Sequence, residues 1–99
     1  MIELSGLAGQ TAAVAAWSRA LADVDGATAT DAERIDAIAE LEKLKAAAAA
    51  AQARITARFL ASRLEEAPPH RTAADVARGV TAEVALARRE SPTRGQQHV

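Results

Sequence analysis

The stretch that decides the fold is residues 30–66, TDAERIDAIAELEKLKAAAAAAQARITARFLASRLEE. Thr30 and Glu33 form a T-x-x-E capping box, in which each side chain accepts a hydrogen bond from the other residue's backbone N–H at the start of a helix. No Gly or Pro interrupts the sequence before the Pro-Pro pair at 68–69. The pattern therefore predicts one unbroken helix over residues 31–66.

Six apolar positions of this helix fall within an arc of roughly 80°, taking about 100° per residue. They are Leu41, Leu44, Ala48, Ala51, Ile55 and Phe59. A narrow apolar seam of this kind is typical of helices that pack against other helices as in a coiled coil. The run of Ala at 46–51 would let a neighbouring helix approach closely. We therefore expect these positions to form an interaction seam.

An earlier helix is predicted over residues 7–24, because its larger apolar residues recur at near-heptad spacing: Leu7, Val14, Trp17, Leu21 and Val24. Gly26 is expected to close this helix, since Gly adopts the left-handed cap conformation without strain. The short polar link that follows favours an antiparallel hairpin with residues 31–66. At about 1.5 Å per residue the long helix measures ~54 Å and its partner ~27 Å. About half of the long helix is therefore left without a partner. Its apolar residues must be covered by the third helix, by a second copy of the chain, or by sequence outside it.

A third helix is predicted over residues 73–90, where Thr72 and Asp75 form a weaker capping box and Val76, Val80 and Val84 recur at helical spacing. Gly79 in its middle costs about 1 kcal/mol relative to Ala, so one helix and two shorter ones both remain open. The expected fold class is all-α: an antiparallel helical hairpin with one long Ala-rich helix plus a third helix. This incomplete bundle would form a single partial domain over residues 1–99.

Composition excludes several kinds of function. The chain has no Cys, which rules out disulfides and thiolate metal sites, and its net charge of −1 favours neither nucleic acid nor anionic membranes. No apolar stretch approaches the ~20 residues of a membrane span, and Glu3 precedes any basic residue, unlike a secretory signal, so a cytoplasmic location is expected. His70 and His98 have no metal-ligand spacing, and no nucleophile motif is present. We expect no catalytic residue, metal site or cofactor.

Two features could indicate DNA binding. Lys43, Arg54 and Arg58 lie beside the apolar seam and could make weak phosphate contacts. Alternatively they complement the helix dipole and solvate an Ala-rich helix, which is the preferred interpretation for a chain with little net charge. Residues 72–89, TAADVARGVTAEVALARR, also look like the opening of a helix-turn-helix of the lactose-repressor type. Only Arg78 separates its DVA unit from the Gly of the expected turn, which is a shorter spacing than such proteins use.

Residues 40–63 (ELEKLKAAAAAAQARITARFLASR) and 75–99 (DVARGVTAEVALARRESPTRGQQHV) are similar to the N-terminal region of an actinobacterial family, domain of unknown function 222. The most specific part is EVALARRESPTRG, residues 83–95. Members of this family typically carry an HNH endonuclease domain downstream. No HNH residue can be carried over, because the chain has no Asn and its two His lie outside any such motif.

The resemblance implies a non-catalytic N-terminal helical part of a longer protein, whose residues 92–99 begin a further helix at Ser91 and Pro92. Its role would be packing or self-association beside a DNA-acting domain. Its partners would be a second copy or the C-terminal part of the parent protein, with DNA reached only through that parent. The alternatives are a stand-alone oligomeric helical interaction module and a helix-turn-helix-like DNA-binding protein.

Overall fold

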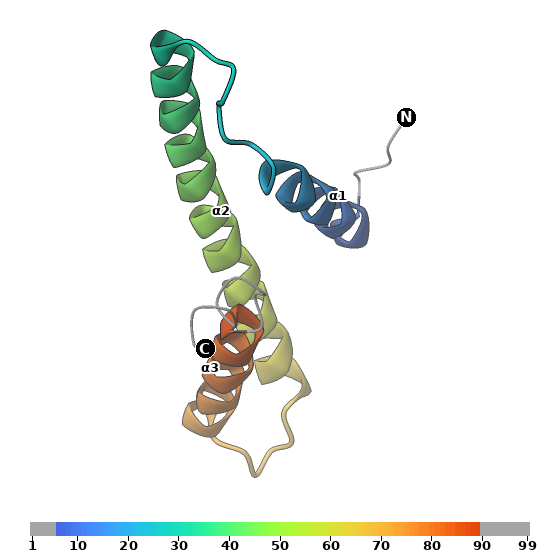
Figure 1. Ribbon diagram of the computed structural model, residues 1–99. Helices are drawn as coiled ribbons and strands as arrows, with labels where there is room; N and C mark the ends of the chain where they lie inside the picture. Colours follow the sequence, from blue (N-terminus) through green and yellow to red (C-terminus); the bar gives the residue numbers. More distant parts are fainter. Residues whose placement is uncertain (1–5, 90–99) are drawn as a thin grey trace. The chain divides into compact units, whose positions relative to one another are not determined.

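The structure is a computed structural model, and it describes residues 6–89. These residues form three helices and no strand: α1 (Leu7–Leu21), α2 (Asp31–Glu66) and α3 (Ala73–Arg89) (Figure 1). The all-α class is confirmed, and the bounds of the long helix agree with the expected 31–66. The helix expected to begin at residue 92 lies outside the described residues. The chain divides between Leu41 and Glu42 into two units, which are described separately.

In the first unit, α1 ends at Leu21 and not at the expected residue 24. The backbone N–H of Asp23 bonds to the carbonyl of Ala20 at 3.4 Å, and that of Val24 bonds to the carbonyl of Leu21 at 3.1 Å. These three-residue steps tighten the chain and so end the regular α-helix early. Gly26 does adopt the expected left-handed conformation, with φ of 70°, but it does so in the turn after the helix.

The apolar seam expected on residues 7–24 is not buried. Its larger side chains, apart from the half-buried Leu21, are between 54% and 69% exposed: Leu7, Val14, Trp17 and Val24. No residue of α1 is buried. The packed hairpin that the structure describes is formed by α2 and α3 of the second unit.

The start of α2 confirms the capping box. The backbone N–H of Thr30 donates to Oε1 of Glu33 at 2.8 Å, and that of Glu33 donates to Oγ1 of Thr30 at 3.1 Å. Arg34 then ties the preceding turn to the helix, because its Nε donates to the carbonyl oxygen of Gly26 at 3.1 Å and its Nη1 pairs with Asp31 at 2.7 Å. These contacts satisfy two orphan donors and fix where α2 begins.

In the second unit, α2 turns back into α3 through a short connection after Glu66. The backbone N–H of Arg71 bonds to the carbonyl oxygen of Pro68 at 3.0 Å, which closes the turn. The side-chain oxygen of Thr72 caps α3 by accepting the N–H of Asp75 at 3.0 Å. The helix then continues through Gly79 without a break, which answers the question that the sequence left open.

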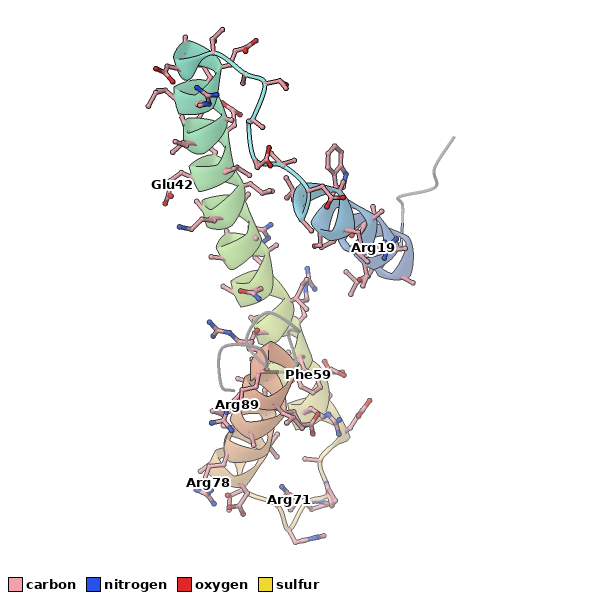
Figure 2. All side chains as sticks on the ribbon, in the orientation of Figure 1. Arg19, Glu42, Phe59, Arg71, Arg78 and Arg89 are labelled. Atoms are coloured by element: carbon pink, nitrogen blue, oxygen red, sulfur yellow. The ribbon has the colours of Figure 1, made fainter. Side chains whose placement is uncertain are left out.

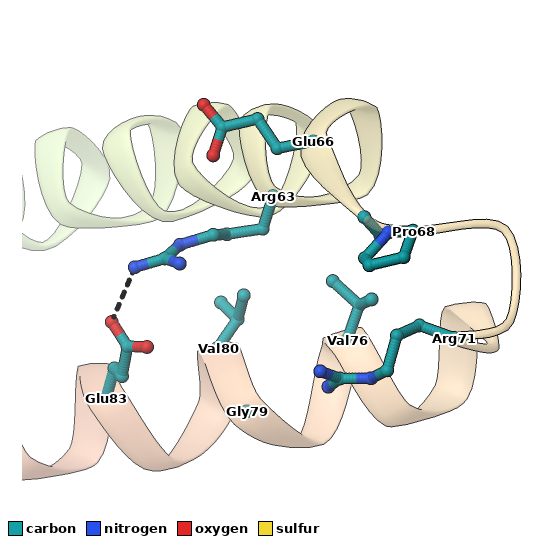
Figure 3. A pocket seen from close by; sticks show the side chains of 9 residues that line it. Arg63, Glu66, Pro68, Arg71, Val76, Gly79, Val80 and Glu83 are labelled. Atoms are coloured by element: carbon teal, nitrogen blue, oxygen red, sulfur yellow. Dashed lines mark hydrogen bonds and ion pairs between the residues drawn. The ribbon is translucent and has the colours of Figure 1, made fainter.

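Two valines of α3 are the buried residues of the described chain. Val76 is 7% exposed and Val80 is 5% exposed, and both point from α3 toward α2 (Figure 3). On α2, Phe59 and Leu60 are half-buried. Nη2 of Arg63 pairs with Oε2 of Glu83 at 3.4 Å across the hairpin, but an ion pair this exposed contributes at most about 1 kcal/mol. Apolar packing of α3 is therefore the main force that holds the hairpin.

Replacing Gly79 with Ala is expected to stabilise the hairpin by about 1 kcal/mol, because Gly is that much less favourable than Ala inside a helix. A Cβ built at this position meets nothing within 4 Å, so no clash opposes the gain. A rise in the midpoint of thermal unfolding, followed by circular dichroism, checks this prediction.

Gly26→Ala is the control, because the same change at φ of +70° forces an L side chain into a strained conformation. It should lower the midpoint. Equal shifts in the two variants would contradict the assignment of Gly79 to an ordinary helical position.

Candidate interaction surface

The most prominent surface feature of the second unit is an apolar face of α2 whose large side chains are about half exposed. Leu44 is 49% exposed and Ile55 is 46% exposed, although both are large apolar side chains on a well-formed helix. Ala48 and Ala51 lie between them on the same face, within an arc of roughly 60°. We name Leu44, Ala48, Ala51 and Ile55 the α2 strip. Leu41, which also belongs to the predicted seam, is the last residue of the first unit and is 37% exposed.

The length of α3 explains why the strip is left uncovered. α3 has 17 residues and so measures about 26 Å, whereas residues 42–66 of α2 measure about 38 Å. Figure 2 shows that the end of α3 near Arg89 lies close to the level of Phe59, while Glu42 lies well beyond it. Phe59 lines the groove between the two helices and is half-buried, so the third helix provides part of the cover that this stretch was expected to need. The strip itself remains open.

An apolar groove of about 930 Å³ adjoins the strip between α2 and α3. On α2 it is lined by Ile55, Phe59 and Leu60, and on α3 by the smaller side chains of Thr81 and Val84. Ile55 belongs both to the strip and to the groove, so the two form one continuous apolar surface. Such a surface resembles the kind that helices dock against.

A second, more polar hollow of about 270 Å³ lies beneath the turn that joins α2 to α3 (Figure 3). Its charged side chains come from both helices and the turn: Arg63, Glu66, Arg71 and Glu83. Arg63 and Glu83 already pair with each other, and the lining contains no Ser, His or Asp that could act with them. The Arg63–Glu83 pair therefore links the two helices across this hollow.

Lys43, Arg54 and Arg58 are all exposed on α2. By helix periodicity they lie beside the α2 strip, and Lys43 is about 16 Å from Arg54 along the helix axis. They do not converge on a common point, as groups that hold one phosphate would. Weak phosphate contacts by these residues stay a prediction.

The helix-turn-helix interpretation is wrong for residues 72–89. It requires a turn near Gly79, and the residues on both sides of Gly79 continue the same helix. The short spacing between the DVA unit and Gly79 leaves no room for such a turn. The unbroken i to i+4 pattern of Val76, Val80 and Val84 favours a single helix instead.

Other kinds of site find no support among residues 6–89. No group of three or more His, Cys, Asp or Glu is arranged to hold a metal ion in this part of the chain. His70 is exposed in the turn before α3, and His98 lies outside the described range. None of the described helices is long and apolar enough to cross a membrane.

Comparisons with protein-family models, with curated proteins and with solved structures found no match to this chain. The similarity to the domain of unknown function 222 family therefore stays a prediction from the quoted residues.

Proposed function

We propose that the chain is a non-catalytic, cytoplasmic helical association module that works through the α2 strip and the adjoining groove. The observation that carries the proposal is the half-exposed state of Leu44 and Ile55 on one face of a capped, continuous helix. Exposed apolar residues are ordinary when they are scattered, whereas a contiguous apolar surface marks an interaction site.

The thin core supports the same proposal. Val76 and Val80 are the buried residues of the described chain, so the hairpin gains little stability from its own packing. Small domains bury too little surface to be more than marginally stable. Covering the remaining half of a Leu or Ile side chain contributes about 1 kcal/mol for each residue. Association would therefore stabilise the fold as well as join two partners.

The family resemblance supplies the cellular setting of this proposal. In a longer protein of the domain of unknown function 222 family, the module would pack or self-associate beside an HNH domain. Contact with DNA would then belong to that domain, and Lys43, Arg54 and Arg58 would at most add weak phosphate contacts. A stand-alone oligomeric module is the alternative, and it uses the same surface.

Circular dichroism at a series of chain concentrations tests the association. The helical signal and the thermal midpoint are expected to rise with concentration over about a hundredfold range, because binding stabilises the folded state by mass action. A midpoint that stays constant throughout this range would exclude self-association as the function of the strip.

A further inference from the structure

The α2 strip has a symmetrical spacing about Ala48. Leu44 and Ala51 lie at nearly equal distances on its two sides, and by the sequence spacing residue 41 is as far from Ala48 as Ile55 is. A half-turn about an axis through Ala48 therefore places the strip of one helix on the strip of an identical antiparallel helix. A self-complementary patch of this kind is the requirement for a two-fold symmetric dimer.

The charges along α2 favour the antiparallel direction. Residues 31–42 carry five acidic residues and one basic residue, and residues 43–63 carry five basic residues and no acidic one. Two parallel copies would place acid beside acid and base beside base. Two antiparallel copies place the acidic third of one helix beside the basic part of the other. Each exposed pair contributes only about 0.2–1 kcal/mol, but several pairs together determine the direction.

The centre of the strip is also the place where a second helix fits best. The run of Ala at 46–51 has no side chain beyond Cβ, so two helix axes can approach to about 8 Å. α3 leaves most of this face free. Of the strip residues only Ile55 lines the groove beside α3, whereas other residues of α2 that line the cavities there, such as Thr56, Leu60 and Arg63, lie roughly 90–150° around the helix from the strip.

We propose that the α2 strip is covered by the α2 strip of a second copy of this chain, in an antiparallel dimer whose two-fold axis passes close to Ala48. This inference rests on the proposed function and adds to it the partner, the direction and the register. Leu44 of each copy then contacts Ala51 of the other, and Ile55 contacts the residue at position 41.

Disulfide cross-linking tests the register, because the chain has no Cys and an introduced one is its only thiol. Ala48→Cys is expected to form a covalent dimer on mild oxidation, since a disulfide requires Cα atoms within about 7 Å. Ala46→Cys is the matched control, because it lies in the same Ala run but faces away from the strip. We expect dimer to form at least about tenfold faster with Ala48→Cys than with this control. Equal rates would overturn the register.

Leu44→Cys and Ala51→Cys test the direction. Neither variant alone should cross-link efficiently, whereas an equimolar mixture of the two should, because residue 44 of one copy lies opposite residue 51 of the other. Efficient cross-linking of each variant with itself indicates a parallel dimer and overturns the inference while the proposed function stands. A chain that sediments as a monomer and gives no specific cross-link overturns both.

Discussion

Replacing Val80 with Asp is expected to detach α3 from α2 and to abolish most of the helical signal of residues 73–89. Val80 is 5% exposed and shares the buried face of α3 with Val76 alone. Burying an unpaired carboxylate there costs about 3 kcal/mol or more, which is comparable to all the stability that so small a hairpin can have. A helix of 17 residues is marginal in water once it has lost its partner. Hydrogen exchange of the α3 amides and circular dichroism measure the loss.

Leu86→Asp is the matched control for this prediction. It places the same charge on the same helix, but Leu86 is 57% exposed, so the substitution should change stability by no more than about 0.5 kcal/mol. If Val80→Asp leaves the α3 amides as protected as Leu86→Asp does, the hairpin is not held by the valine face.

The second large effect is expected from Leu44→Glu. If two copies associate through the α2 strip, each copy loses an apolar contact and gains a carboxylate at the interface. A two-fold symmetric dimer contains the substitution twice, so the loss in binding free energy is doubled. With about 1.5 kcal/mol lost in each copy, the dissociation constant should rise by about a hundredfold. Sedimentation velocity over a concentration series measures this change. In concentrated samples the helix content should change little although the affinity falls, because Glu is itself a good helix former.

Ile35→Glu is the control for this substitution. Ile35 is also an exposed apolar residue of α2, 65% exposed, but it lies on the opposite side of the helix from Leu44. Its replacement should leave the dissociation constant within about threefold of the original. An equal loss in both variants would show that the strip has no special role in association.

The helices themselves could be predicted from the sequence, because their signals are local. The capping box of Thr30 and Glu33 and the absence of Gly or Pro before residue 68 predict the bounds of α2, and the structure has them at the same residues. The end of α1 was predicted less well. Gly26 is visible as a cap candidate, but the shift to three-residue hydrogen bonds after Arg19 has no comparable sequence signal.

The burial of the apolar face of α3 could not be predicted from spacing alone, because it depends on how sharply that face differs from the rest of the helix. Residues 7–24 contain larger apolar residues at heptad spacing, yet Ala surrounds them on most sides and no narrow face results. Val76, Val80 and Val84 stack one turn apart on a single face among polar and small neighbours. That face is the one the structure buries. The difference in polarity between the two sides of each helix is larger for α3 than for residues 7–24. Taking this difference into account, in addition to the spacing of apolar residues, would have favoured burial of the α3 face.

The candidate surface was predicted in part. The seam from Leu41 to Ile55 follows directly from helix periodicity, and its larger side chains are between 37% and 49% exposed, while its role in association stays a prediction. The groove was missed, because Thr81 and Val84 come from another helix and join Phe59 only after the hairpin has formed. The partial burial of Phe59 has the same origin. Periodicity describes one helix at a time and does not include its neighbour.

Sedimentation equilibrium of the unmodified chain tests the central claim most directly, because it measures molecular mass without a label or a substitution. The α2 strip as a self-association surface predicts a mass that approaches twice that of one chain at high concentration and falls toward that of a single chain on about hundredfold dilution. The mass of a single chain at every concentration would contradict the claim.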